Sequence, residues 1–259
     1  MNDSLSAAAI TRDLNTTVIG REVNYYPQVP STNQVALEMA RQGAAEGLVV
    51  IAGEQTGGRG RRQRVWQSPS GSISLSIVLR PEVAQLPELI MLASLAVART
   101  VREVTGLSPQ LKWPNDILVD GKKVCGILVE SEIKGRLAQA VIGIGINVNN
   151  PVPALAERTA PITSLMAEAR RPLPLLELVR RLLAAADEFY GRLRSGGSVF
   201  ETWRDSLTTL GHEVSVTSDE GELVGVAEAV DRDGSLWVRD GVGKRHRVIA
   251  SDVSLRRRS

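Results

Sequence analysis

The sequence predicts an α+β fold with a mixed, mainly antiparallel sheet, followed by a small β-domain. Two consecutive apolar stretches, "ILVDGKKVCGILVE" and "SEIKGRLAQAVIGIGINV", each contain a short turn with glycine, which is typical of β-hairpins. After Gly211, short strands alternate with turn pairs such as Asp233-Gly234, and this pattern indicates a small barrel of SH3 type. We therefore divide the chain into a flexible N-terminal segment at 1–20, a main domain at 21–209 and a β-domain at 210–259.

The elements of the main domain follow from hydrophobic spacing and turn residues. The stretch "STNQVALEMARQG" predicts a helix that Ser31 or Thr32 caps and Gly43 ends. "LVVIAGE" predicts a buried strand, whereas "SISLSIVL" alternates polar and apolar residues and predicts a half-buried strand. The remaining helices are expected at 87–106, near 163–169 within a proline-rich loop, at about 174–194 and at about 198–209.

Composition excludes several classes of protein. The 259 residues are 43% hydrophobic and 23% charged, with a net charge of +2, so basic residues matter only where they cluster. One cysteine excludes an intramolecular disulfide, and two distant histidines, His212 and His246, predict no zinc-type metal site. The first thirty residues lack the apolar core of a signal peptide, and no continuous run of about 18 apolar residues predicts a membrane span. We expect a cytoplasmic protein with no membrane partner.

The stretch "GEQTGGRGRRQRVW" (53–66) combines glycines with four arginines directly after a buried strand. It is not a P-loop, because Arg59-Gly60 stands where Lys-Ser/Thr is required, and "GRGRRQ" fails the G-x-G-x-x-G pattern at Gln63. A solvated surface loop and a nucleic-acid patch are the alternatives, but the second would need interleaved aromatic residues. Since arginine grips carboxylates and phosphates in bidentate fashion, we predict a loop that closes over a small, multiply anionic ligand.

A second cluster of polar residues follows in "KWPND" (112–116), which places a cation, an aromatic ring, a rigid turn, an amide and a carboxylate within five positions. A strand end with a Pro-Asn turn is the simpler alternative. The Asp120-Gly121 turn should fold Lys123 back toward Asp116, whereas Lys122 is expected to be solvated. For both Trp66 and Trp113, packing in the core is an alternative role.

These pieces together resemble the biotin protein ligase family. The matching stretches are "STN" (31–33), "EQTGGRGRRQRVWQSPSG" (54–71), "KWPNDILV" (112–119), "KVCGILVE" (123–130) and "GIGINVN" (143–149). They occur in the family's order and spacing over most of residues 25–150, and the β-domain is similar to the family's C-terminal module. The resemblance implies that 21–209 is a catalytic domain with the fold shared by lipoate ligases and class II tRNA synthetases.

Two features depart from the family. The family usually has glycine where this chain has Gln63, which bears on the flexibility of the glycine–arginine loop. Many members carry an N-terminal helix-turn-helix domain, but only about 25 residues precede the ligase region here. We therefore expect no specific DNA binding, although a biotin-responsive DNA-binding repressor remains an alternative function. A lipoate or octanoate ligase, with the same chemistry on a similar fold, is the closest alternative.

The resemblance implies a role for each matching residue. The implied catalytic residues are Lys112, Lys123, Asp116 and Arg59. The implied biotin-binding residues are Ser31, Thr32, Asn33, Gln55, Gly58, Arg59, Gly60, Arg61, Trp66, Lys112 and Gly126. The implied ATP- and adenylate-binding residues are Arg59, Arg61, Arg64, Trp66, Asn115, Lys123 and Asn147, with a backbone-bonding amide as the alternative for Asn147. Mg²⁺ would arrive with ATP, and the acceptor would be the biotin carboxyl-carrier domain of acyl-CoA carboxylases.

The chemistry of such a reaction agrees with these residue types. Biotin's ureido ring is neutral, so hydroxyls and amides can satisfy it without burying charge. Its carboxylate must approach the α-phosphate of ATP, and fixed cations are needed where these two anions meet. The acyl-adenylate reacts with water, which gives the glycine–arginine loop a role as a lid. The β-domain is expected to cap the ATP site or to guide the carrier, rather than to act as an independent module.

Overall fold

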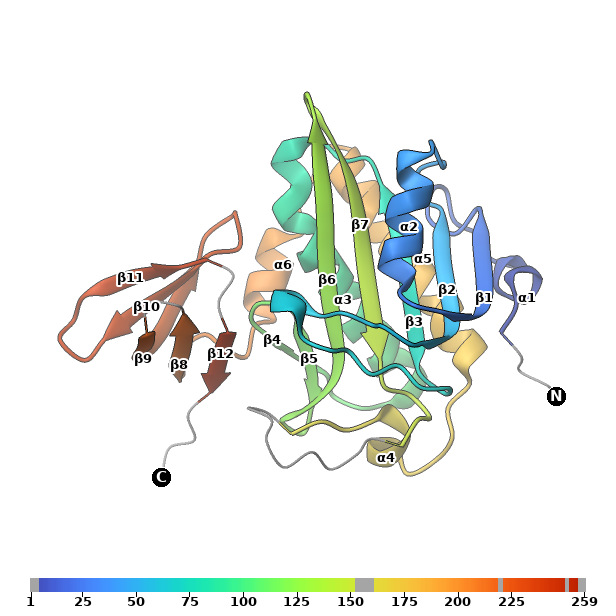
Figure 1. The fold of residues 1–259 in the computed structure, drawn as a ribbon. Helices are drawn as coiled ribbons and strands as arrows, with labels where there is room; N and C mark the ends of the chain where they lie inside the picture. Colours follow the sequence, from blue (N-terminus) through green and yellow to red (C-terminus); the bar gives the residue numbers. More distant parts are fainter. Residues whose placement is uncertain (1–4, 152–160, 219–220, 250–251, 256–259) are drawn as a thin grey trace.

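The computed structural model describes residues 5–151, 161–218, 221–249 and 252–255 (Figure 1). Its main sheet has seven strands in the order β1-β2-β3-β7-β6-β5-β4. Only β1 and β2 pair in parallel among these strands, and the other neighbours are antiparallel. The strands are β1 (Val23–Val29), β2 (Val49–Gln55), β3 (Ile73–Leu79), β4 (Gln110–Lys112), β5 (Asp116–Val119), β6 (Lys122–Lys134) and β7 (Leu137–Ile146). The prediction of a mixed, mainly antiparallel sheet with two hairpins is confirmed.

Helices cover both faces of this sheet. They are α1 (Ala7–Thr11), α2 (Thr32–Arg41), α3 (Leu86–Thr105), α4 (Leu165–Ala169), α5 (Leu175–Arg194) and α6 (Phe200–Asp205), with short 3₁₀ turns η1 (Arg61–Gln63) and η2 (Val83–Gln85). In Figure 1, α3 and α5 lie behind the sheet and α2 lies in front of it. The predicted long helix ends as expected, because Gly106 takes the left-handed conformation (φ 76°) that glycine tolerates best.

Strand β3 differs from its prediction as a half-buried strand, because all seven of its residues are buried. The alternation itself is correct. Ile73, Leu75 and Ile77 belong to the large core shared with α3 and α5, while Val78 packs on the other face in the smaller cluster beneath α2. The polar face of β3 is therefore covered by α2, and Ser76 bonds to residues of that helix.

The flexible N-terminal segment predicted at 1–20 is wrong for the described residues 5–20. Ile10 and Ile19 are fully buried. The Asp187 carboxylate of α5 accepts hydrogen bonds from the backbone N–H groups of Thr17, Val18 and Ile19, at 2.7, 2.8 and 2.8 Å. These charge-assisted bonds fix the segment to the main domain. Residues 1–4 lie outside the described ranges.

The chain ends in a second, five-stranded antiparallel sheet, in the order β11-β10-β9-β8-β12. Its strands are β8 (Glu213–Ser218), β9 (Gly221–Val230), β10 (Leu236–Asp240), β11 (Arg245–Val248) and β12 (Asp252–Leu255). It forms a separate body beside β4 and α6 (Figure 1). The SH3-like β-domain predicted from the turn pattern is confirmed.

Helix α3 is long and apolar. By length and composition, Val83–Thr105 is apolar enough to cross a membrane. Polar residues interrupt its apolar run, so it is not the continuous stretch typical of a membrane span. Eleven of the 20 residues of α3 are buried, among them Leu92, Ala96 and Val101, and they pack into the core behind the sheet. The helix is therefore a core element of the main domain.

Candidate active site

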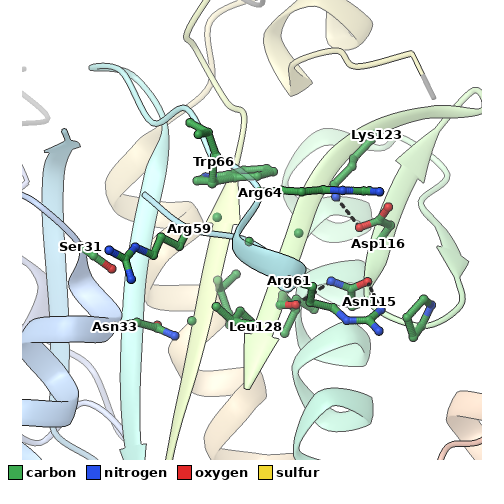
Figure 2. Close-up of a pocket in the computed structure, with 18 of the residues that line it drawn as sticks. Ser31, Asn33, Arg59, Arg61, Arg64, Trp66, Asn115, Asp116, Lys123 and Leu128 are labelled. Atoms are coloured by element: carbon green, nitrogen blue, oxygen red, sulfur yellow. Dashed lines mark hydrogen bonds and ion pairs between the residues drawn. The ribbon is translucent and has the colours of Figure 1, made fainter. Parts of the chain in front are cut away.

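A cavity of about 610 Å³ lies between the front of the main sheet and the glycine–arginine stretch (Figure 2). Every site residue predicted from the sequence lines it, except Gly58 and Asn147. The predicted residues in its wall are Ser31, Thr32, Asn33, Gln55, Arg59, Gly60, Arg61, Arg64, Trp66, Lys112, Asn115, Asp116, Lys123 and Gly126. The fold thus brings together four stretches that are far apart in the chain.

Strand register explains why these residues meet. Ser74, Gly145, Gly126, Asp116 and Lys112 are successive Cα partners across β3, β7, β6, β5 and β4. Residues directly opposite each other in neighbouring strands share one face of a sheet. The row therefore places the carboxylate and the lysine on the same surface as two glycines, whose lack of a side chain leaves room for the Trp66 ring.

A neutral polar cluster occupies one end of the cavity, at the start of α2 and the end of β2. Gln55 Oε1 accepts from the backbone N–H of Thr32 (2.8 Å) and from its hydroxyl (3.1 Å). The Ser76 hydroxyl lies 2.8 Å from Thr32 Oγ1 and 2.6 Å from Asn33 Oδ1. Asn33 Nδ2 donates to Glu130 at 2.7 Å. These bonds hold the hydroxyl and amide groups in fixed orientations before any ligand binds.

Glycines of β6 and β7 make room for the side chains that cover the sheet. A Cβ added to Gly143 would lie 2.1 Å from Asn33 Oδ1, and one added to Gly145 would lie 2.4 Å from Trp66 Nε1. One added to Gly126 would lie 3.2 Å from the same tryptophan ring. Gly143 and Gly145 are not among the site residues predicted from the sequence. Their spacing of two within a buried strand is the signal that could have placed them on one face under a bulky group.

Lys123 and Arg64 lie at the other end of the cavity (Figure 2). Lys123 Nζ lies 2.5 Å from Asp116 Oδ1, as the Asp120-Gly121 turn predicted, and 5.5 Å from the centre of the Trp66 ring. Five cationic side chains line the cavity, against one carboxylate, Asp116, among the described lining residues. The cations are Arg59, Arg61, Arg64, Lys112 and Lys123. Such an excess of positive charge attracts an anionic ligand.

The glycine–arginine loop folds back on itself above the sheet. The Gly60 N–H donates to the Arg64 carbonyl (2.7 Å), and the Trp66 N–H donates to the Gly58 carbonyl (2.9 Å). Gly58 is buried, and a Cβ there would lie 2.4 Å from the Trp66 carbonyl oxygen, so its place in the loop is structural. In Figure 2, Arg59 extends toward the side of Ser31 and Arg64 toward the side of Lys123. One loop can therefore reach both ends of the cavity.

Arg61 and Asn115 connect this loop to the "KWPND" turn. Arg61 Nη1 donates to Asn115 Oδ1 at 3.3 Å, and Asn115 Nδ2 donates to the Ile127 carbonyl at 2.8 Å (Figure 2). Lys112 is 9% exposed at the end of β4. The loop and the turn thus meet in the wall of the same cavity.

Two other expectations have different outcomes. Asn147 is buried away from the cavity, and its Nδ2 donates to the Thr163 carbonyl at 3.2 Å, which is the backbone-bonding alternative. Lys122, expected to be solvated, pairs with Glu168 at 2.7 Å. Cys125 is fully buried in the core, and burial raises the pKa of its thiol.

Trp113 joins the two domains. It is 2% exposed, its backbone N–H donates to the Thr209 hydroxyl at 2.9 Å, and its indole N–H donates to the Gly234 carbonyl at 2.8 Å. Thr217 of β8 also lines the main cavity. The β-domain therefore contacts both the "KWPND" turn and the cavity itself, which agrees with the expectation that it caps the site.

The cavity and the fold can be compared with known proteins. The family described as "Biotin/lipoate A/B protein ligase family" matches residues 25–147, and the "Biotin protein ligase C terminal domain" matches residues 209–256. The bifunctional ligase/repressor BirA of Bacillus subtilis is 32% identical over 97% of this chain and 79% of its own length. A biotin–[acetyl-CoA-carboxylase] ligase of Mycobacterium tuberculosis is 32% identical over 97% of each chain. The structure of a biotin protein ligase from Aquifex aeolicus in complex with biotin and ATP covers 92% of this chain and all of its own, with a TM-score of 0.71 and 25% identity.

Proposed function

Because the chain belongs to the biotin protein ligase family, we propose that it activates biotin as biotinyl-5′-AMP and transfers the biotinyl group to one lysine of a biotin carboxyl-carrier domain. It is a biotin ligase with biotin and ATP as substrates, and a carboxylase is its partner. One observation carries the proposal: a single cavity combines a neutral polar cluster at one end with five cations, of which Lys123 and Arg64 lie at the other end and Arg59 extends toward Ser31 (Figure 2). A function in the cytoplasm remains a prediction.

The neutral end suits the ureido ring of biotin, which offers two N–H donors and one carbonyl acceptor. Ser31, Thr32, Asn33 and Gln55 supply hydroxyls and amides there, and a ring that is itself uncharged requires no buried charge. Trp66 and Leu128 supply apolar cover for the thiophane ring and the valeryl chain. The carboxylate at the end of that chain would then point toward the cations.

The first step joins biotin to AMP at the cationic end. A biotin carboxylate oxygen attacks the α-phosphorus of ATP, the new C(O)O–P bond forms, and pyrophosphate leaves with the electron pair of the broken P–O bond. Negative charge accumulates on the α-phosphate oxygens in the transition state. Lys123, Lys112 and the loop arginines are placed to stabilise that charge, and fixed cations in a partly dry site do so without reorganising.

The second step transfers the biotinyl group. The neutral ε-amine of the acceptor lysine attacks the acyl carbon, an amide bond forms, and AMP leaves. The nitrogen must lose a proton, and Asp116 is the carboxylate available in the described cavity wall. Its ion pair with Lys123 keeps it close to the reacting end.

Mg²⁺ would enter with ATP and would neutralise part of the phosphate charge. Mg²⁺ prefers oxygen ligands and commonly binds through one or two carboxylates together with substrate phosphates. Asp116 is the single carboxylate among the described residues of the cavity, and it is already paired with Lys123. We therefore infer that phosphate oxygens and water would supply most of the ligands.

Isothermal titration tests the choice of ligand. Biotin should bind, and lipoate should bind at least about tenfold more weakly, because a hydrogen-bonding pocket rejects a ring that leaves its polar groups unpaired. Equal binding of both compounds would contradict the assignment of the neutral end to a ureido ring.

Alanine in place of Gly143 or Gly145 should weaken biotin binding by about tenfold or more, because the added methyl group must displace Asn33 or Trp66. Titration calorimetry measures the affinity, and thermal unfolding shows whether the variant folds. Gly191→Ala is the matched control, since nothing lies within 4 Å of a Cβ there. Wild-type affinity in both cavity variants would show that these two glycines do not shape the biotin site.

Trypsin should cut the glycine–arginine loop (57–64) early in the free protein, and biotinyl-5′-AMP should suppress this cleavage. Arg59 and Arg64 are exposed, and each charge-assisted hydrogen bond to the ligand would contribute about 1.5–3 kcal/mol. Ordering the backbone costs about 1–2 kcal/mol per residue, so several such bonds and the packing of Trp66 must act together. Protection should be slight with ATP, partial with biotin and strongest with the adenylate.

Two loop variants test the same role of the loop as a lid. Arg59→Ala and Arg61→Ala should still form some adenylate but should release it, so exposed lysines of bystander proteins become biotinylated. A loop that resists trypsin without ligand, or is cut equally with and without adenylate, would exclude the role as a lid.

A further inference from the structure

The segment after the proline-rich loop pairs with β6 at the cationic end of the cavity. The Lys123 N–H donates to the Pro161 carbonyl at 2.8 Å, and the Thr163 N–H donates to the Lys123 carbonyl at 2.9 Å. Ile162 lies between them as the parallel bridge partner of Lys123. Both Ile162 and Lys123 line the cavity. The backbone of Lys123 is therefore held from one side by a short segment of only three residues.

A cluster of three side chains stabilises this segment. Glu168 Oε1 lies 2.7 Å from Lys122 Nζ and accepts a hydrogen bond from the Thr163 hydroxyl at 2.5 Å. The Glu168 side chain is 10% exposed, whereas that of Lys122 is 40% exposed. The Lys122 ammonium, and after it the Thr163 hydroxyl, hold the pKa of the Glu168 carboxyl below its usual range. Glu168 is thus a largely buried, ionised acceptor that joins β6 to the start of α4.

Lys122 and Lys123 are consecutive residues of one strand, so their side chains leave it in opposite directions. Lys123 reaches Asp116 and the cavity, while Lys122 reaches Glu168 behind it. The pairing register shifts at this point, because Leu118 pairs with Lys123 and Ile117 with Cys125, which leaves Val124 as an extra residue on β6. A bulge disrupts the regular hydrogen bonding between strands beside Lys123. The orientation of the Lys123 side chain therefore depends more on the contacts made by residues 161–163.

We propose that Glu168 is a positioning residue for the phosphate end of the cavity. Through Lys122 and Thr163 it holds residues 161–163 against the Lys123 backbone, and this aims the Lys123 ammonium and the Ile162 side chain at the nucleotide. Glu168 does not line the cavity and does not touch substrate in this role. The inference rests on the proposed function in assigning ATP to this end.

The test compares single and paired substitutions in the full chain. Glu168→Gln and Lys122→Gln should each raise the KM for ATP, or lower kcat for adenylate formation, by about tenfold, since each removes a charge-assisted bond. The Kd for biotin should stay within about twofold, because the polar cluster at the far end is untouched. The exchanged pair Lys122→Glu/Glu168→Lys should recover most of the loss. Glu103→Gln and Arg181→Gln, which break an exposed ion pair between α3 and α5, should change neither parameter.

A second measurement is independent of activity. Hydrogen exchange of the Lys123 and Thr163 amides should be faster in Glu168→Gln than in the wild type, because these two amides form the bonds that Glu168 supports. If the wild type makes no biotinyl-5′-AMP, the proposed function fails, whereas the exchange result still decides whether Glu168 holds the segment. Unchanged exchange together with unchanged ATP kinetics would overturn the proposal. Equal losses in ATP and biotin binding, with no recovery in the exchanged pair, would assign Glu168 a general structural role instead.

Discussion

Replacing Lys123 by alanine is expected to slow adenylate formation by roughly 100- to 1,000-fold, which is the usual effect of removing one donor from a site of developing negative charge. The Kd for biotin should change by less than about threefold, because the ring end of the cavity lies on the other side, beside Ser31 and Asn33 (Figure 2). The rate falls because Lys123 stabilises the transition state, in which negative charge is spread over the carboxylate and the α-phosphate. Single-turnover release of pyrophosphate measures the rate, and titration calorimetry measures biotin affinity.

Lys123→Arg is the matched control for this prediction. It keeps the positive charge and the ion pair with Asp116 but changes the geometry of the donor, so it should recover part of the rate. If alanine lowers biotin affinity as much as it lowers the rate, Lys123 serves general binding and the assignment to the α-phosphate is wrong.

Deleting residues 211–259 should lower ligation by roughly a hundredfold, while biotin binding persists. The deletion removes the Gly234 carbonyl to which the Trp113 indole N–H donates. It also exposes the Trp113 side chain, because this residue is only 2% exposed in the intact protein. Trp113 lies between Lys112 and the Asn115-Asp116 pair, so its movement displaces three groups at the reacting end. A displacement of about 1 Å in a catalytic group can cost a hundredfold in rate. Assays of biotin binding and of carrier ligation separate the two effects.

A point substitution keeps this prediction testable if the shortened chain fails to fold. Trp113→Phe removes the indole N–H that bonds to Gly234 but keeps an aromatic ring, and it should reproduce part of the loss in ligation. Trp237→Phe is the matched control, because its indole N–H donates to Asp231 within the β-domain, at 2.8 Å. Full ligation by the shortened chain would show that the β-domain is an accessory module.

The sequence predicted the parts of this site that depend on local features. A hairpin turn at Asp120-Gly121 was enough to bring Lys123 near Asp116, and this ion pair is present at 2.5 Å. Alternation in β3 was read correctly, and only the helix that covers its polar face was missed. Such features depend on residues a few positions apart, where periodicity and turn chemistry are reliable guides.

The contacts that the sequence could not predict are made between residues far apart along the chain. Lys122 was expected to be solvated because its partner, Glu168, is 46 residues away. Trp113 bonds to Gly234 across 121 residues, and Asp187 fixes the N-terminal segment across about 170. Asn147 had two plausible roles, and only its contact with Thr163 separates them. In each of these cases the residues next to the polar group in the sequence do not indicate which distant group it contacts.

Mass spectrometry of the acceptor tests the central claim most directly. The full chain is incubated with biotin, ATP, Mg²⁺ and an isolated biotin carboxyl-carrier domain, with each of the first three omitted in turn. We predict that one lysine of the carrier gains one biotinyl group, that one AMP is released for each group transferred, and that no gain occurs without biotin or without ATP. A carrier that gains no mass, gains it without ATP, or gains lipoyl as readily as biotinyl would contradict the account.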